Sequence, residues 1–137
     1  MQSEIQIHRA ALKSATELSE RSHDEQARIM EQLAQSEGWE VRVKGELAAL
    51  GGFAWRDDLD AFEAWLAAGP ALRPSLRASI DALGGVLDVQ LGRGAIFARI
   101  KAGADASLRL CHLIGFDRVP AFVADGHGFH VYGGGVR

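Results

Sequence analysis

The chain has 137 residues, of which 47% are hydrophobic and 24% are charged, with a formal net charge of −3. This is the composition of one ordinary folded domain, and it excludes a disordered or collagen-like chain. No stretch approaches the roughly 18 apolar residues of a transmembrane helix, and the first residues lack the basic start and apolar run of a signal peptide.

The basic residues of the second half of the chain are scattered along the sequence. They are Arg73, Arg77, Arg93, Arg99, Lys101, Arg109 and Arg118. Phosphate recognition needs a concentrated basic patch. We therefore expect a protein partner and no nucleic acid.

The N-terminal segment carries two patterns that are typical of helix starts. Ser3–Gln6 and Ser22–Glu25 both resemble capping boxes. Apolar residues follow each of them at helical spacing, namely Ile7, Ala11, Ala15 and Leu18 after the first, and Ile29, Met30 and Leu33 after the second. The sequence predicts one helix to about Glu20 and another that stops near Gly38, or one long helix with an irregularity. Residues 1–38 are accordingly predicted as a helical segment, and residues 39–137 as an α/β domain.

The apolar stripe of this N-terminal segment is narrow and has charged flanks. Such a helix usually packs on one side and faces water on the other. The alternative is an interhelical seam, in which residues 1–37 bind a partner or a second copy of the chain.

The middle of the chain predicts alternating strands and helices. Trp39–Val43 alternates as a strand does, and residues 46–50 read as a helical turn that ends at Gly51–Gly52. Residues 57–66 have the acidic first turn and apolar face of a helix, which explains their carboxylates better than a calcium or magnesium site does. A helix beginning at Pro74 is predicted to end at Gly84–Gly85. Residues 86–91 and 95–101 then form two strands joined by Gly92–Gly94.

The C-terminal stretch predicts a helix and a hairpin. Residues 105–114 read as a helix that starts at Asp105 and is closed by Gly115. Two β-rich runs, 121–124 and 129–132, flank the turn Asp125–Gly128. Alternation places Phe122, Phe129 and Val131 on a buried face, and His130 and Tyr132 on the other. Pro120 fits the first residue of a strand or a bend, where the preceding bond is a candidate for the cis isomer.

The order of elements from Ala95 to Arg137 is similar to the second half of a thioredoxin fold. The run Val119-Pro120-Ala-Phe-Val123 resembles the F-type TrbC family of conjugative transfer. The resemblance implies an α/β fold with a thioredoxin-like mixed sheet and extra N-terminal helices, and a cis bond at Pro120. It also implies a binding face at Val119, Pro120, Phe122 and Tyr132. The extra hairpin over 86–101 and the absence of a final helix depart from that pattern, so an α+β fold with two β-hairpins is the alternative.

Cysteine and histidine usage limits the chemistry. The one cysteine, Cys111, excludes an internal disulfide and a Cys-x-x-Cys pair, and hence dithiol oxidoreductase activity. We expect Cys111 to be a small buried hydrophobe, with a nucleophile assisted by His112 as the alternative. His127 and His130, with Asp125 and His112, are candidates for a metal site, but a solvated hairpin tip explains them better. No cofactor is expected.

The leading hypothesis is therefore a non-catalytic thioredoxin-like domain that acts in protein binding or assembly. The TrbC resemblance implies conjugative transfer or type IV secretion, and a periplasmic location if a signal peptide was removed. The sequence as given indicates the cytoplasm. Two alternatives stay open: a small enzyme that uses Cys111 or the region of His127 and His130, and a helix-mediated dimer with a structural or regulatory role.

Overall fold

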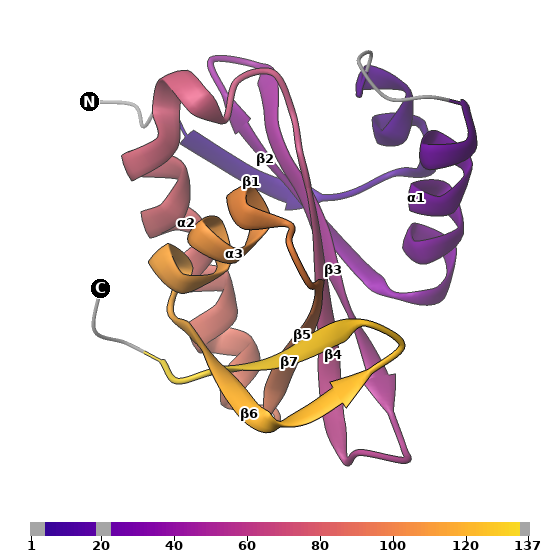
Figure 1. Ribbon diagram of the computed structural model, residues 1–137. Coiled ribbons are helices and arrows are strands. Elements are labelled where there is room, and N and C mark those ends of the chain that lie inside the picture. Colours follow the sequence, from indigo (N-terminus) through magenta and orange to yellow (C-terminus); the bar gives the residue numbers. More distant parts are fainter. Residues whose placement is uncertain (1–4, 19–22, 135–137) are drawn as a thin grey trace. The chain divides into compact units, whose positions relative to one another are not determined.

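The computed structural model describes residues 5–18 and 23–134. Figure 1 follows the chain from indigo at the N-terminus to yellow at the C-terminus. The strands are β1 (Ile5–Arg9), β2 (Glu37–Val43), β3 (Glu46–Arg56), β4 (Ala61–Ala68), β5 (Ile96–Lys101), β6 (Phe116–Ala124) and β7 (His127–Tyr132). The helices are α1 (His23–Gln35), α2 (Leu76–Leu91) and α3 (Asp105–Ile114), with short 3-10 helices η1 (Leu12–Glu17) and η2 (Arg73–Ser75).

The seven strands are hydrogen-bonded in the order β1-β2-β3-β4-β5-β7-β6. Strands β4 and β5 are parallel, whereas β1–β2, β2–β3, β5–β7 and β6–β7 are antiparallel. This mixed sheet with helices confirms the predicted α/β class. Within the described residues, no helix has the length and apolar character needed to cross a membrane.

The chain divides into two compact units, which we describe separately. The first comprises Met1–Ala54 with Trp65–Ala82, and the second comprises Trp55–Ala64 with Leu83–Arg137. We call them the first unit and the second unit.

The N-terminus of the first unit corrects the predicted first helix. Its residues form strand β1, which pairs antiparallel with β2 from Ile5 opposite Val43 to Arg9 opposite Trp39, and then η1. The run Ile-Gln-Ile alternates with a period of two, so it satisfies a strand as well as a helix. Pairing with β2 decides between them. The second predicted helix is confirmed as α1.

A hairpin replaces the helical turn predicted over residues 46–50. Lys44 and Gly45 have φ of 51° and 81°, and they join β2 to β3 with Val43 opposite Glu46. Positive φ at both central residues defines the tight turn that matches the twist of a β-hairpin. The helix-forming residues that follow are therefore paired into a strand, because tertiary context overrides local propensity.

Gly51 and Gly52 lie inside β3 and do not end an element. A Cβ on Gly51 would come within 2.8 Å of the Trp65 carbonyl oxygen, and one on Gly52 within 2.8 Å of Trp65 Nε1 and Ser36 Oγ. Trp65 Nε1 donates a hydrogen bond to Ser36 Oγ at 3.1 Å. Glycine is required at both positions because these neighbours approach so closely.

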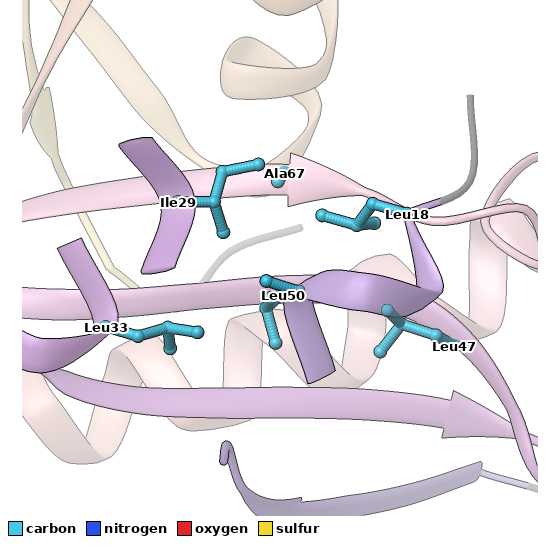
Figure 2. Close-up of a cluster of buried hydrophobic side chains, with 7 residues drawn as sticks. Leu18, Ile29, Leu33, Leu47, Leu50 and Ala67 are labelled. Atoms are coloured by element: carbon cyan, nitrogen blue, oxygen red, sulfur yellow. The ribbon is translucent and has the colours of Figure 1, made fainter. Parts of the chain in front are cut away.

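The core of the first unit joins η1, α1 and the strands β3 and β4 (Figure 2). Its buried members are Ala15, Leu18, Ile29, Leu33, Leu47, Leu50 and Ala67. Leu18 and Leu50 are almost completely inaccessible to solvent. Four members of the apolar stripe, Ala15, Leu18, Ile29 and Leu33, thus pack on β3 and β4 within this unit, whereas Ile7, Ala11 and Met30 are exposed.

In the second unit, a turn and a strand replace the helix predicted over residues 57–66. Residues 57–60 form the turn, in which Asp60 has φ of 50°, and β4 begins at Ala61. Trp55 on one side of the turn packs edge-on against Phe62 on the other, with ring centroids 4.9 Å apart. The acidic residues therefore occupy the turn between two strands and not the first turn of a helix.

Helix α2 runs through Gly84 and Gly85 to Leu91, so the strand predicted over residues 86–91 is wrong. Ile80 and Leu87 are both buried, seven residues apart on one helical face. The apolar spacing thus outweighs the low helix propensity of two glycines. The strand predicted over 95–101 is confirmed as β5.

The C-terminal elements match the prediction except at Pro120. Helix α3 ends at Gly115, which has φ of 123°. β6 begins at Phe116, earlier than predicted, and its register with β7 shifts between Val119 and Val123. No peptide bond among the described residues is cis, so the cis bond predicted at Pro120 is wrong. Pro120 instead lies at the register shift between Val119 and Val123 in β6, which is an edge strand. The missing N–H of proline therefore leaves no backbone hydrogen bond of the sheet unmade.

The faces of β7 are the reverse of those predicted. His130 and Tyr132 are buried, with exposed fractions of 7% and 2%, whereas Val131 is 40% exposed. The Tyr132 hydroxyl donates a hydrogen bond to Asp88 on α2, and its ring packs against Phe116. Helix α2 covers the face of β7 that carries His130 and Tyr132. The alternation of residues along β7 does not reveal which face a helix covers.

Candidate active site

The parallel pairing of β4 and β5 is short. Phe62 lies opposite Ile96 and Glu63 opposite Phe97, and no further pair joins the two strands in the described part of the chain. β5 continues to Lys101 with β7 as its antiparallel partner. Past Phe97, the β4-facing edge of β5 therefore offers backbone N–H and C=O groups to an extended ligand, as a free strand edge does.

Glu63 holds a fixed negative charge at the end of this ladder. One carboxylate oxygen accepts a hydrogen bond from Arg56 Nη1 at 2.7 Å, and the other accepts one from Arg99 Nε at 2.7 Å. Its side chain is 19% exposed, and that of Arg99 is 41% exposed. Two guanidinium groups thus fix the Glu63 carboxylate in place, and charge-assisted bonds of this kind are the strongest hydrogen bonds in proteins.

Arg56 is shared between two carboxylates. It binds Asp58 through Nε and Nη2, at 3.1 and 2.9 Å, in addition to Glu63. The hydrogen bonds that Arg56 donates to Asp58 and then to Glu63 raise the pKa of Arg56, and Arg56 in turn lowers the pKa of Asp58. The network positions Glu63 relative to β5.

An aromatic group lies at the start of the same ladder. The guanidinium of Arg93 is 5.6 Å from the centre of the Phe62 ring, which itself contacts Trp55. A Cβ on Gly94 would come within 3.1 Å of the Phe62 ring. These contacts hold the strands together where the parallel pairing begins.

The N-terminus of α2, in the first unit, is a second candidate for binding. Its first turn has no acidic residue, and the side chains of Arg73 and Arg77 are exposed. Ser75 Oγ donates to the Ala71 carbonyl oxygen at 2.5 Å, while the Ala71 N–H donates to the Leu47 carbonyl oxygen at 3.1 Å. The loop before α2 is thereby tied to β3. The positive end of the helix dipole and two arginines favour an anion here.

The predicted residues Cys111 and His112 point to opposite sides of α3, Cys111 into the protein and His112 into solvent. Cys111 is buried, and burial raises the pKa of its thiol to about 12. The His112 side chain is 79% exposed, and its Nδ1 lies 3.9 Å from an Asp117 carboxylate oxygen. A thiol with such a pKa is protonated at neutral pH and is a poor nucleophile.

The hairpin histidines do not come together either. His127 lies at the tip, with Nδ1 2.9 Å from the Asp125 carbonyl oxygen, whereas His130 is buried in β7. The described residues contain no group of three or more His, Cys, Asp or Glu arranged to hold a metal ion. The hairpin therefore gives no positive support to a metal site there.

The predicted binding residues lie on different surfaces. Pro120 is exposed on the edge strand β6 beside the half-buried Val119, whereas Tyr132 is buried against α2. The side chain of Phe122 lies outside the described residues. Sequence reasoning missed Glu63, Arg56 and Arg99, although a lone glutamate within the apolar run Ala61–Ala68 is a signal that could have been used.

Comparisons with known proteins give a consistent result at the level of structure. No family model matches the chain, and no curated protein matches it in sequence. Solved structures do match. The Campylobacter jejuni N-acetyltransferase PseH has a TM-score of 0.63 at 10% identity, with 94% of this chain and 97% of that one covered. The Escherichia coli ribosomal-protein-S18-alanine N-acetyltransferase has a TM-score of 0.59 at 19% identity, with 93% and 90% covered. The microcin C7 self-immunity acetyltransferase MccE, solved with acetyl-CoA and AMP, has a TM-score of 0.65 at 12% identity, with 95% and 92% covered.

These matches contradict the thioredoxin-like interpretation and the TrbC resemblance. They also contradict the hypothesis of a non-catalytic thioredoxin-like protein-binding domain in conjugation or type IV secretion. The order β5, α3, β6, β7 is a strand, a helix and a hairpin, and it occurs in the thioredoxin fold as well as in the fold of these acetyltransferases. This shared order explains why the C-terminal sequence resembles a thioredoxin fold. The elements before β5 differ, and there β4 pairs in parallel with β5 after a three-strand antiparallel run. The chain has the fold of the GNAT acetyltransferases.

Proposed function

We propose that the protein is an acyltransferase that moves an acetyl group, or a similar acyl group, from coenzyme A to an amine. The observation that carries the proposal is the two-residue parallel ladder between β4 and β5, with a free edge on β5 beyond it. The match to acetyltransferases over more than nine-tenths of the chain supports it. Acetyl-CoA is present in the structure of one of these neighbours.

Each unit, taken by itself, has one feature that fits part of an acyl-CoA. The anionic end of the cofactor suits the N-terminus of α2 with Arg73 and Arg77, because the helix dipole and both side chains attract negative charge. The amide-bearing arm suits the free edge of β5, where backbone groups can pair with an extended chain. When bound, the cofactor supplies a thioester, whose carbonyl carbon is open to attack by an amine.

The transfer balances without a further reagent. The amine would attack in its neutral form, after a cationic amine has released one proton to solvent. Its nitrogen would form a bond to the carbonyl carbon, the carbon–sulfur bond would break, and the second proton lost by the nitrogen would end on the sulfur, which leaves as the thiol. Glu63 is the charged group at the end of the ladder, and both of its oxygens are held by arginines. We therefore assign it the role of holding Arg56 and Arg99 in place at the end of the ladder.

Binding of acetyl-CoA to the whole chain tests the proposal, with calorimetry as the readout. Arg73→Ala and Arg77→Ala should each weaken binding by about two- to fivefold, the usual effect of one charge at a helix terminus. Arg28→Ala, at an exposed position on α1, is the matched control and should leave the affinity unchanged.

Release of free thiol in the presence of a panel of amines tests the reaction itself. Wild-type protein should release thiol faster with an amine acceptor than without one. A chain that binds no acetyl-CoA at millimolar concentration would remove the proposal. Equal weakening by all three arginine variants would remove the assignment of the α2 N-terminus.

A further inference from the structure

One row of residues crosses the C-terminal strands just beyond the end of the parallel ladder. His130 on β7 lies opposite Ala98 on β5 and opposite Arg118 on β6. Residues paired across antiparallel strands carry their side chains on the same face. Ala98 is the first residue of β5 after the last one paired with β4. The row therefore begins beside the free edge of β5 to which we assign the amide-bearing arm of the cofactor.

His130 is a buried side chain with an unsatisfied atom. Its exposed fraction is 7%, and its Nε2 has no hydrogen-bond partner in the described part of the chain. Leaving such a group without a partner costs free energy, so buried polar atoms nearly always have one. Burial, and secondarily the charge of Arg118, lower the pKa of His130, so the ring is neutral at neutral pH.

Arg118 and His130 face the same point above Gly128. A Cβ built on Gly128 would lie 3.4 Å from Arg118 Nε and 3.6 Å from His130 Nε2. No acidic group of the described residues pairs with Arg118, whose side chain is exposed. The Arg118 guanidinium and the unsatisfied imidazole nitrogen thus both lie next to the Cα of Gly128. Because Nε2 is closed to solvent, a ligand reaches it when the exposed Arg118 side chain shifts outward.

We propose that Arg118 and His130 bind a carboxylate and that, if the proposed acyl transfer is correct, this carboxylate belongs to the acceptor. The acceptors would then be amino acids or other amines that carry a carboxylate. The guanidinium donates to one oxygen of the group, and His130 donates to the other in the tautomer that bears its proton on Nε2. One cation and one neutral donor match a single negative charge better than the double charge of a phosphate.

Titration with sodium acetate, followed by amide chemical shifts at constant ionic strength, tests the site without any turnover. Acetamide, which has the same shape and no charge, is the control ligand. Acetate should cause saturable shifts at Gly128 and His130, and acetamide should not. Arg118→Gln should weaken acetate binding at least tenfold. Gly128→Ala should do the same by placing a methyl group between the two donors, with no clash and no positive φ.

Arg109→Gln removes an exposed charge from α3 in the same unit, and it should leave acetate binding unchanged. Equal acetate shifts in wild type and in Arg118→Gln would overturn the site. The acceptor assignment is tested by comparing kcat/KM for amino acids with that for the corresponding amides. A transferase that shows no preference for the free acids would overturn the acceptor assignment and leave the proposed function standing. Absence of all transfer, with acetate still bound, would instead count against the proposed function alone.

Discussion

Glu40 is the buried charge on which we base our first prediction. Ser14 Oγ on η1 donates to its Oε2 at 2.7 Å, and Arg42 Nε donates to its Oε1 at 2.8 Å. Arg42 also binds Glu17 on η1, and its Nη1 donates to the Gly45 carbonyl oxygen at 3.1 Å. One carboxylate therefore ties η1 to β2, and it lies under the helix that supplies Ala15 to the core.

Glu40→Gln keeps the shape of the side chain and removes the charge. A hydrogen bond to a charged group contributes about 1.5–3 kcal/mol. Because glutamine still accepts a neutral hydrogen bond and Arg42 keeps Glu17 as a partner, we expect a loss of about 2 kcal/mol, the range for one such bond, in the free energy of unfolding at pH 7. This corresponds to a fall of roughly 8 °C in Tm for a chain of this size. Glu17→Gln, at the solvent-exposed end of the network, should cost less than about 1 kcal/mol.

The pH dependence follows from the same contacts. Burial by itself raises the pKa of Glu40, but the hydrogen bonds from Arg42 and Ser14 outweigh it and the pKa is lowered. The hydrogen bond from Arg42 likewise lowers the pKa of Glu17. A carboxyl with a lowered folded pKa stabilises the fold fully above its unfolded pKa, roughly 4.3, and loses that contribution as the pH falls through the folded value.

Urea unfolding of wild type and Glu40→Gln at pH 7 and at pH 3 measures this difference. The difference in unfolding free energy between the two proteins should shrink as the pH falls, because only the wild type has an ionised group at position 40 to lose. A variant as stable as wild type at pH 7 would refute the reasoning, as would a gap that is unchanged at low pH.

Three further predictions concern the core, α2 and the thiol. Leu50→Ala should lower the unfolding free energy by about 3–4 kcal/mol in urea titration, because its side chain is fully buried and leaves a cavity; an effect below 1 kcal/mol would show that the site collapses. Gly85→Ala should raise stability by about 0.5–1 kcal/mol, since no atom lies within 4 Å of the added methyl group inside a helix, whereas Gly103→Ala, at φ of 84°, should lower it. Cys111 should resist iodoacetamide at pH 8 in the folded protein and react at once in denaturant, because burial holds its pKa near 12; equal rates in both states would contradict that.

The sequence alone determined those elements whose local signals agree with their surroundings. α1 has a capping pattern and an apolar stripe, α3 ends at a glycine with positive φ, and the C-terminal hairpin turns at Asp125–Gly126. The α/β class followed from these elements. In each case the preferred local conformation is also the one that the core needs, so no distant contact has to override it.

Tertiary structure decided the rest. Residues 46–50 are strong helix formers, yet the Lys44–Gly45 turn and pairing with β2 make them a strand. Gly84 and Gly85 look like a terminator, but the buried face of α2 continues past them. A period of two and a period of 3.6 cannot be distinguished over short apolar runs.

The candidate sites depend even more on contacts between distant segments. Glu63 meets Arg99 across 36 positions of the chain, and Arg118 meets His130 only because β6 and β7 pair in one register. Sequence spacing carries no signal for either meeting, since strand register fixes which side chains share a face. The composition and the local helices could therefore be read from the sequence, whereas the short parallel ladder and the charges beside it arise only when β4, β5, β6 and β7 are paired.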